Sequence, residues 1–161
     1  GRAAAIKARE LAQENDTKVA ISLSDPGIVE HFKQGLKDMV GPGVDLLFCN
    51  KQEALNWCET DDIDMSIEIM QKTAKQFSIT MGGEGAVIFD GFNTLHAQAQ
   101  PVTAVDTNGA GDMFAGAFLY AITQGQSYLD AATFANRAAS AVVGQYGPRL
   151  HVSEYNGLKI A

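Results

Sequence analysis

The sequence predicts an α/β fold, a three-layer sandwich built on a mostly parallel sheet. Three observations support this prediction. Short apolar runs alternate with amphipathic helical segments through the first half of the chain, a hairpin signal follows, and two further helices come after it. The chain has 161 residues, which is enough for one domain with a sizeable core.

The composition is that of a soluble globular protein, with 46% hydrophobic and 19% charged residues. The net charge is −7 and no Lys/Arg cluster occurs, so nucleic acid and anionic membranes are not expected partners. No apolar run is long enough to span a bilayer, and we see no secretory signal. The two cysteines form no Cys-x-x-Cys pair and the three histidines are scattered. These features predict a reducing, cytoplasmic location and no zinc site.

The first half of the chain is predicted as alternating helices and strands. A helix is expected over residues 1–15, where small apolar residues recur at helical spacing among charged ones. Residues 18–23 and 44–49 are apolar enough to be buried strands of a parallel sheet. Between them, residues 28–39 form an amphipathic helical pattern that the Gly41-Pro42-Gly43 sequence interrupts.

The second half contains two more short helices, a hairpin and two longer helices. Helices are expected over residues 50–57 and 65–77, the second preceded by aspartates that suit helix capping better than a metal site. Strands are expected over residues 78–81, 86–89 and 94–99, because Asp90-Gly91 is a hairpin signal. Small apolar residues predict helices over residues 109–123 and 127–143.

Polar or glycine-rich loops follow several of the predicted strands. They comprise residues 25–26, 50–53, 82–85 and 106–112. Ligands bind beyond the carboxyl ends of strands in sheets of this class, so we expect the four loops to converge on one site.

The most informative stretch runs from Val105 to Gly116. Gly109 and Gly111 leave the backbone open at the expected start of a helix, where unpaired N–H groups and the helix dipole favour an anion. Asp106 and Asp112 flank this proposed anion hole, a combination that suits phosphoryl chemistry. The string lacks the lysine of a Walker loop and the third glycine of a dinucleotide fingerprint. The alternative is a glycine-rich turn that simply caps a packed helix.

Residues 106–112, Asp-Thr-Asn-Gly-Ala-Gly-Asp, resemble the signature of the ribokinase family, the PfkB carbohydrate kinases, which includes the adenosine kinases. The resemblance implies that Asp112 is the catalytic base and that the N–H groups of Gly109, Ala110 and Gly111 form the anion hole. In isolation, Asp112 would equally suit a partner for the helix dipole. For Asp106, a turn-holding role and a role in binding a monovalent cation, usually potassium, both stay open.

Three further sites match the family. Asn50 and Glu53, spaced as Asn-x-x-Glu after a strand, resemble the motif that organises Mg²⁺ and its waters, although helix capping explains the pair as well. Residues 80–85, containing Thr80, Gly82 and Gly85, resemble the Thr-x-Gly-x-x-Gly nucleotide loop, with a simple turn as the alternative. Asn136 matches a position beside the adenine, or is a polar residue in a small-residue helix.

The resemblance covers residues 17–148 and leans toward adenosine-kinase-like members. Family members are longer, so we expect the N-terminal half and its lid to be missing and residues 1–161 to be the nucleotide-binding and catalytic-base portion of the kinase domain. The implied function is ATP-dependent phosphorylation of a primary hydroxyl on a small-molecule sugar or nucleoside, with Mg²⁺ and in some members K⁺. The alternative is a non-catalytic nucleotide-binding module. Monomer and homodimer are both open.

Overall fold

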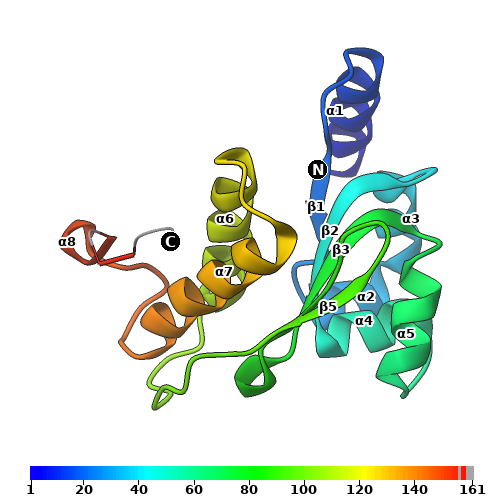
Figure 1. Cartoon of the computed structure of the whole chain (residues 1–161). Helices are drawn as coiled ribbons and strands as arrows, with labels where there is room; N and C mark the ends of the chain where they lie inside the picture. Colours follow the sequence, from blue (N-terminus) through cyan, green and yellow to red (C-terminus); the bar gives the residue numbers. More distant parts are fainter. Residues whose placement is uncertain (156, 159–161) are drawn as a thin grey trace. The chain divides into compact units, whose positions relative to one another are not determined.

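The computed structural model describes residues 1–155 and 157–158. The chain forms two compact units. Unit 1 comprises residues 1–79 and 89–93, and unit 2 comprises residues 80–88 and 94–161. The strands follow the order β1-β2-β3-β4-β5 in one sheet (Figure 1). Because β1 and β2 are parallel and a tight turn joins β4 to β5, the sheet is mixed, and the predicted α/β class is confirmed.

Unit 1 contains helices α1 to α5 and most of strands β1 to β3. Its elements are α1 (Arg2–Glu14), β1 (Ala20–Ser22), α2 (Pro26–His31), α3 (Lys33–Val40), β2 (Val44–Asn50), α4 (Lys51–Cys58), α5 (Ile63–Met70) and β3 (Ala74–Thr80). The central strand β2 is almost wholly buried, as its continuous apolar sequence predicts. Strand β1 differs from the prediction, because it is mostly exposed at one end of the strand order.

Two predicted helices of unit 1 have different bounds in the structure. The segment expected as one helix over residues 28–39 is two helices, α2 and α3, which meet at Phe32, where ψ is 23°. Phe32 is 68% exposed, so the apolar stripe that suggested a single helix is not buried as one face. The helix expected over residues 65–77 ends at Met70, and residues 74–77 begin β3, in which Ala74 and Phe77 are buried.

Unit 2 contains the hairpin and the two long helices. Its elements are η1 (Gly82–Glu84), β4 (Ala86–Phe89, whose last residue is in unit 1), β5 (Thr94–Ala97), α6 (Ala110–Thr123), α7 (Tyr128–Val143) and α8 (Val152–Tyr155). The Asp90 carboxylate accepts the N–H groups of Phe92 and Asn93 and closes the predicted hairpin. Helices α6 and α7 match the prediction closely and lie side by side (Figure 1).

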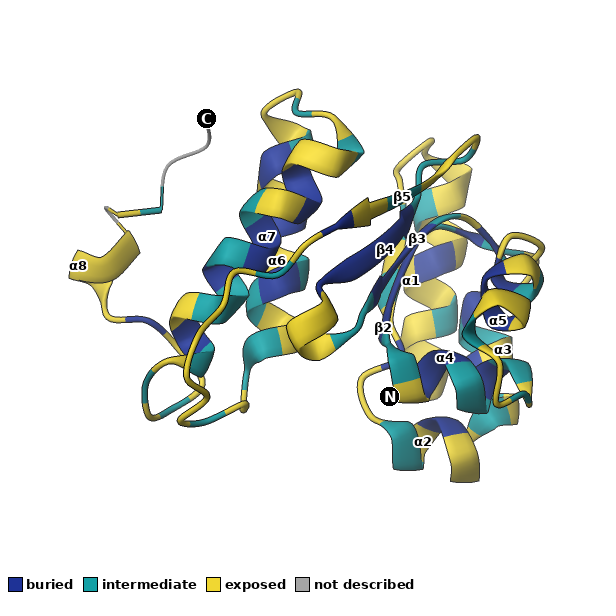
Figure 2. Ribbon diagram, turned by 60° about the horizontal axis from the view of Figure 1, so that its bottom comes forward, coloured by how far each residue is buried: buried dark blue, intermediate teal, exposed yellow. Residues whose placement is uncertain are grey.

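The buried surface of unit 2 lies where α6 and α7 meet and along β4 (Figure 2). Phe114 and Phe118 of α6 are buried beside a row of alanines on α7, and their rings are stacked at a centroid distance of 6.1 Å. Small residues allow the two helix backbones to approach closely, so this packing fixes the direction in which α6 presents its first turn.

Cys49 is buried in β2, as expected for a core thiol at a strand end, and neither it nor Cys58 forms a disulfide within the described part of the chain. Among those same residues, no helix has both the length and the apolar character needed to cross a membrane.

Candidate functional site

The anion-hole turn lies at the start of α6. Gly109 is the N-cap residue in a left-handed conformation, with φ of 77° and ψ of −3°. The N–H of Ala110 donates to Thr107 O at 3.3 Å, and the N–H of Met113 donates to Gly109 O at 2.9 Å. No acceptor within the described residues receives the N–H groups of Gly111 and Asp112. These two donors are therefore available to an anion.

The two glycines of this turn serve different purposes. A Cβ atom at Gly109 would lie 2.3 Å from Pro148 O, and the positive φ adds strain for any other residue. A Cβ atom at Gly111 would meet nothing within 4 Å. Gly109 is thus required by the protein itself, whereas Gly111 leaves open space beside the unpaired N–H groups.

Asp106 holds the turn from its other side. One carboxylate oxygen accepts the N–H of Asn108 at 3.0 Å, and the other accepts the N–H of Gly147 at 3.1 Å. These two hydrogen bonds lower the pKa of Asp106, so the carboxylate is ionised at neutral pH. The turn-holding role foreseen for Asp106 is therefore confirmed, and a role in binding a monovalent cation stays a prediction.

A cavity of about 500 Å³ in unit 2 brings most of the predicted nucleotide-site residues together. The glycine loop after β3, the first turn of α6 and the middle of α7 all line it. The predicted residues among its lining are Thr80, Gly82, Gly85, Ala110, Gly111 and Asn136. The volume is within the range of small-molecule sites, and the cavity contains the open face of Gly111. Two of the four loops that we expected to converge, residues 82–85 and 106–112, thus line one cavity, and the convergence of the other two stays a prediction.

The glycine loop after β3 is tightly built. It consists of the short helix η1, and its ends are joined by the N–H of Met81, which donates to Gly85 O at 2.7 Å. Gly85 has a φ of 93°, and a Cβ atom there would lie 2.1 Å from Ala97 O. A Cβ atom at Gly82 or Gly83 would meet nothing within 4 Å. The loop therefore presents bare backbone to the cavity while Gly85 fixes it against the strand β5 end.

Asn136 is buried on α7, where its side chain serves the fold as well as the cavity. Its amide Nδ2 donates to Ala97 O at 2.9 Å and to Gln98 O at 3.2 Å. The donors of this amide are therefore used by the last residue of β5 and the residue after it, and Oδ1 is the atom left to accept a hydrogen bond from a ligand.

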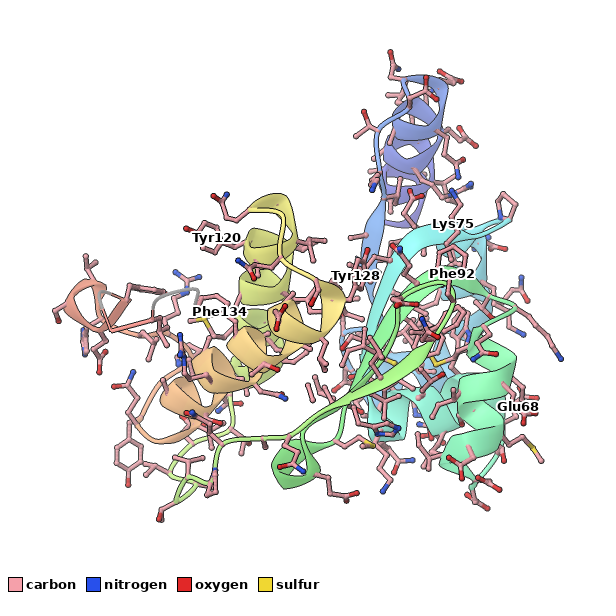
Figure 3. All side chains as sticks on the ribbon, viewed as in Figure 1. Glu68, Lys75, Phe92, Tyr120, Tyr128 and Phe134 are labelled. Carbon is pink, nitrogen blue, oxygen red and sulfur yellow. The ribbon has the colours of Figure 1, made fainter. Side chains whose placement is uncertain are left out.

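Asp112 lies in the first turn of α6 but lines a different cavity from Gly111. This second cavity, of about 790 Å³, also lies wholly in unit 2, between α6, α7 and the segment after Gly147. Tyr120 of α6 and Phe134 of α7, labelled in Figure 3, also line it, and their rings are tilted at a centroid distance of 6.3 Å. Consecutive residues of one helical turn thus face two cavities, and Asp112 is exposed in the second.

Asn50 and Glu53 belong to unit 1 and form a capping box at the start of α4. Asn50 Oδ1 accepts the Glu53 N–H at 2.8 Å, and Glu53 Oε2 accepts the Asn50 N–H at 3.0 Å. The Asn50 amide also donates to Glu53 Oε1 at 2.7 Å. The capping explanation for Asn-x-x-Glu is therefore correct, and it leaves the magnesium role open, because each oxygen retains a lone pair for a metal-bound water.

Glu53 is only 4% exposed, and burial raises its pKa above the ordinary value of 4.5. The hydrogen bond from the Asn50 backbone opposes this shift, and the nearby negative charge of Asp25 reinforces it. A buried carboxylate whose charge is disfavoured suits a nearby cation, which would lower the pKa again. The described residues contain no cluster of three or more His, Cys, Asp or Glu side chains that could hold a metal ion.

The raised pKa of Glu53 predicts a pH dependence of stability. The folded state binds the proton of Glu53 more tightly than the unfolded state does. The stability that this proton contributes is fully present below about pH 4.5 and is lost as the pH rises through the raised pKa. We expect the unfolding free energy of Glu53→Gln, relative to the unmodified protein, to rise as the pH increases from about 4.5 through the raised pKa. Urea unfolding at several pH values measures this change.

The matched control for this titration is Glu59→Gln. A hydrogen bond and the charge of Lys33 lower the pKa of Glu59, so its contribution is present above the ordinary value and lost as pH falls. The relative stability of Glu59→Gln is therefore expected to move in the opposite direction. A flat difference for Glu53→Gln would contradict the raised pKa.

The sequence analysis assigned no functional role to residues 143–149, which contact the glycine turn at the start of α6. Val143 O accepts the N–H groups of both Val105 and Asp106, at 2.9 and 3.3 Å. Gly147 bonds to Asp106, and Pro148 packs against Gly109. The only signal in the sequence is a glycine–proline pair after a helix, which is too common to indicate a site.

Residues 2–154 match the pfkB family of carbohydrate kinases. An adenosine kinase from Schizosaccharomyces pombe is 33% identical over 130 residues, which are 71% of this chain and 38% of the relative. The crystal structure of adenosine kinase from Sinorhizobium meliloti is 34% identical with a TM-score of 0.90, over 96% of this chain and 48% of that one. A probable sugar kinase from Rhizobium etli is 33% identical with a TM-score of 0.88, over 97% and 49%.

The chain thus spans about half the length of the solved structures and less than half of the yeast relative. The family match covers nearly all of the chain, including the 500 Å³ cavity and the capping box of α4. The chain belongs to the pfkB family of carbohydrate kinases.

Proposed function

We propose that this chain is the nucleotide-binding and catalytic-base portion of a kinase that transfers the γ-phosphoryl group of ATP to a primary hydroxyl of a sugar or nucleoside. The observation that supports this most directly is the cavity that combines the glycine loop, the open N-terminus of α6 and Asn136. Asp112, the residue after Gly111 on α6, lines the second cavity, which we propose for the acceptor. The similar proteins, two adenosine kinases and a probable sugar kinase, favour an acceptor of this class.

In the proposed reaction, Asp112 accepts the proton of the acceptor hydroxyl. A bond forms between the hydroxyl oxygen and the γ-phosphorus as the bond from that phosphorus to the bridging oxygen breaks, and ADP leaves. The N–H groups of Gly111 and Asp112 stabilise the negative charge on the transferring group. Because the transition state is loose, the positioning of the carboxylate matters more than strong deprotonation of the hydroxyl.

The nucleotide is proposed to lie along the 500 Å³ cavity, with its phosphates at Gly111 and its base near Asn136. Backbone glycines allow close approach of the chain, and Asn136 Oδ1 is suited to accept an N–H of the base. Asn50 and Glu53 of unit 1 are proposed to hold Mg²⁺ through water, and such an ion supplies positive charge to a nucleotide. A monovalent cation near Asp106 is proposed as a structural support of the turn.

The function is tested with the full-length gene product by coupling ADP release to a spectrophotometric assay. Adenosine, ribose, fructose and other acceptors are each supplied with Mg-ATP. Turnover that depends on one acceptor supports the kinase and identifies its substrate. ATP binding by calorimetry without turnover on any acceptor would favour the non-catalytic nucleotide-binding module.

The open space at Gly111 gives a specific test of the phosphate site. We expect Gly111→Ala to fold normally, because its methyl group meets no protein atom and alanine improves helix propensity by up to about 1 kcal/mol. That methyl group would occupy the space beside the unpaired N–H groups, so the dissociation constant for ATP should rise by about tenfold or more, equivalent to about 1.4 kcal/mol.

The control is Gly35→Ala, a helix glycine of α3 in unit 1 whose Cβ would contact only the Arg2 side chain, at 3.7 Å. It should bind ATP as the unmodified protein does. Unchanged ATP affinity in Gly111→Ala would mean that the phosphates bind elsewhere.

A further inference from the structure

We propose that Arg149 is a further catalytic residue, a cation that meets the phosphoryl group as it reaches the acceptor. This inference depends on the proposed kinase function. The anion hole consists of backbone N–H groups, and the described part of unit 2 contains two arginines, Arg137 and Arg149, and no lysine. A transition state with charge spread over three phosphoryl oxygens benefits from a cationic side chain, and arginine suits it best.

Arg149 is placed on the acceptor side of the proposed site. It lines the same 790 Å³ cavity as Asp112, together with Pro148. Its side chain is exposed and has no ion pair or hydrogen bond with any described residue, while its backbone O accepts the Gln145 side chain at 3.4 Å. Nothing described in the protein neutralises this charge, so the guanidinium is available to a phosphoryl oxygen.

The backbone that carries Arg149 is fixed to the anion hole. Gly147 donates its N–H to Asp106, and Pro148 O would lie 2.3 Å from a Cβ atom at Gly109. Arg149 is the next residue along the chain. Its Cα is therefore held relative to the first turn of α6, whereas the long side chain can adjust to the moving phosphoryl group.

Arg137 provides the contrast within the same unit. It lies over the ring of Phe134 at 5.6 Å, as a cation–π pair, and it lines neither the cavity of Asp112 nor that of Gly111. If catalysis needed only positive charge in unit 2, replacing either arginine would lower kcat. If the charge acts at the reacting phosphoryl group, only the replacement of Arg149 lowers it.

The position of Arg149 predicts which kinetic constant changes. Because it lies on the side of Asp112 and not in the nucleotide cavity, it contacts the phosphoryl group during transfer more than in bound ATP. In the full-length protein, Arg149→Ala should lower kcat about 100-fold or more, with less than about a threefold change in the KM for ATP. Arg149→Lys should retain an intermediate kcat, and Arg137→Ala should have a kcat near that of the unmodified protein.

Chemical rescue separates a catalytic role from a structural one. Guanidinium ion, added at concentrations that do not unfold the protein, should raise the kcat of Arg149→Ala in a saturable manner and leave that of Asp112→Asn unchanged. A kcat for Arg149→Ala equal to that of the unmodified protein would overturn the inference, as would a loss of kcat that guanidinium does not restore. If the unmodified protein itself shows no acceptor-dependent turnover, the proposed kinase function fails instead.

Discussion

Asp112→Asn is expected to lower acceptor-dependent ADP release by about 10²–10⁴-fold, the usual contribution of a general base, while ATP still binds. Asparagine has nearly the same shape but cannot accept the hydroxyl proton. Asp112 lines the 790 Å³ cavity proposed for the acceptor and not the 500 Å³ cavity proposed for the nucleotide, so its loss should affect kcat far more than the affinity for ATP. Stopped assays of kcat together with calorimetric titration of ATP measure the two effects separately.

The alternative role for Asp112, a partner for the helix dipole, has a matched control in Asp130→Asn. Asp130 occupies the first turn of α7 as Asp112 occupies that of α6, and it bonds to the N-cap residue Ser127. Each substitution should cost about 0.3–1 kcal/mol of stability through the dipole. Only Asp112→Asn should lose turnover. Equal activity in the two variants would leave Asp112 with the dipole role alone.

Gly85→Ala is expected to destabilise the protein by about 2–5 kcal/mol, the sum of left-handed backbone strain and overpacking. At φ of 93°, a methyl group would lie 2.1 Å from Ala97 O and 2.7 Å from Ala99 N, and both neighbours are backbone atoms that cannot rotate away. The same strand end receives the amide of Asn136, so a shift there would disturb the nucleotide cavity as well. Thermal and urea unfolding measure the loss.

Gly83→Ala is the control for this substitution, two residues earlier in the same loop. Its Cβ would meet no atom within 4 Å, so its unfolding midpoint should stay close to that of the unmodified protein. An equal loss of stability in both variants would show that the loop, and not the contact with Ala97, limits stability.

Much of unit 2 could be predicted from the sequence, because several local signals agree. Residues 109–123 and 127–143 carry small apolar residues at helical spacing, and Gly109 and Ser127 mark where the two helices begin. The loops at Gly85 and Gly111 follow extended segments. Because ligands bind beyond strand ends in such sheets, we predicted that these loops share a site, and both line the 500 Å³ cavity.

The differences arise where a short pattern fits two structures. The apolar residues Ala74 and Phe77 lie three positions apart, a spacing that suits a helix as well as a strand. The segment forms the strand β3 because it pairs with its neighbours in the sheet. Phe32 fits the stripe of one long helix, yet it remains exposed where α2 and α3 meet. Tertiary packing decides both cases, and it is not visible in a window of a dozen residues.

The contribution of Gly147 and Pro148 could not be predicted for a different reason. Their partners, Asp106 and Gly109, lie about forty residues earlier, and no local pattern reports a contact of that separation. The motif itself was visible, but the segment that holds it in place was not.

The bond between Asp106 and Gly147 also has a consequence for the order in which the protein acquires its working form. The signature residues 106–112 leave the ribosome long before Gly147 does, and until then the Asp106 carboxylate lacks one of its two partners. A nascent chain can form α6 early, because helices need only local contacts. The turn at Gly109 gains its contacts with Val143, Gly147 and Pro148 only after residues 143–148 have been synthesised and have docked.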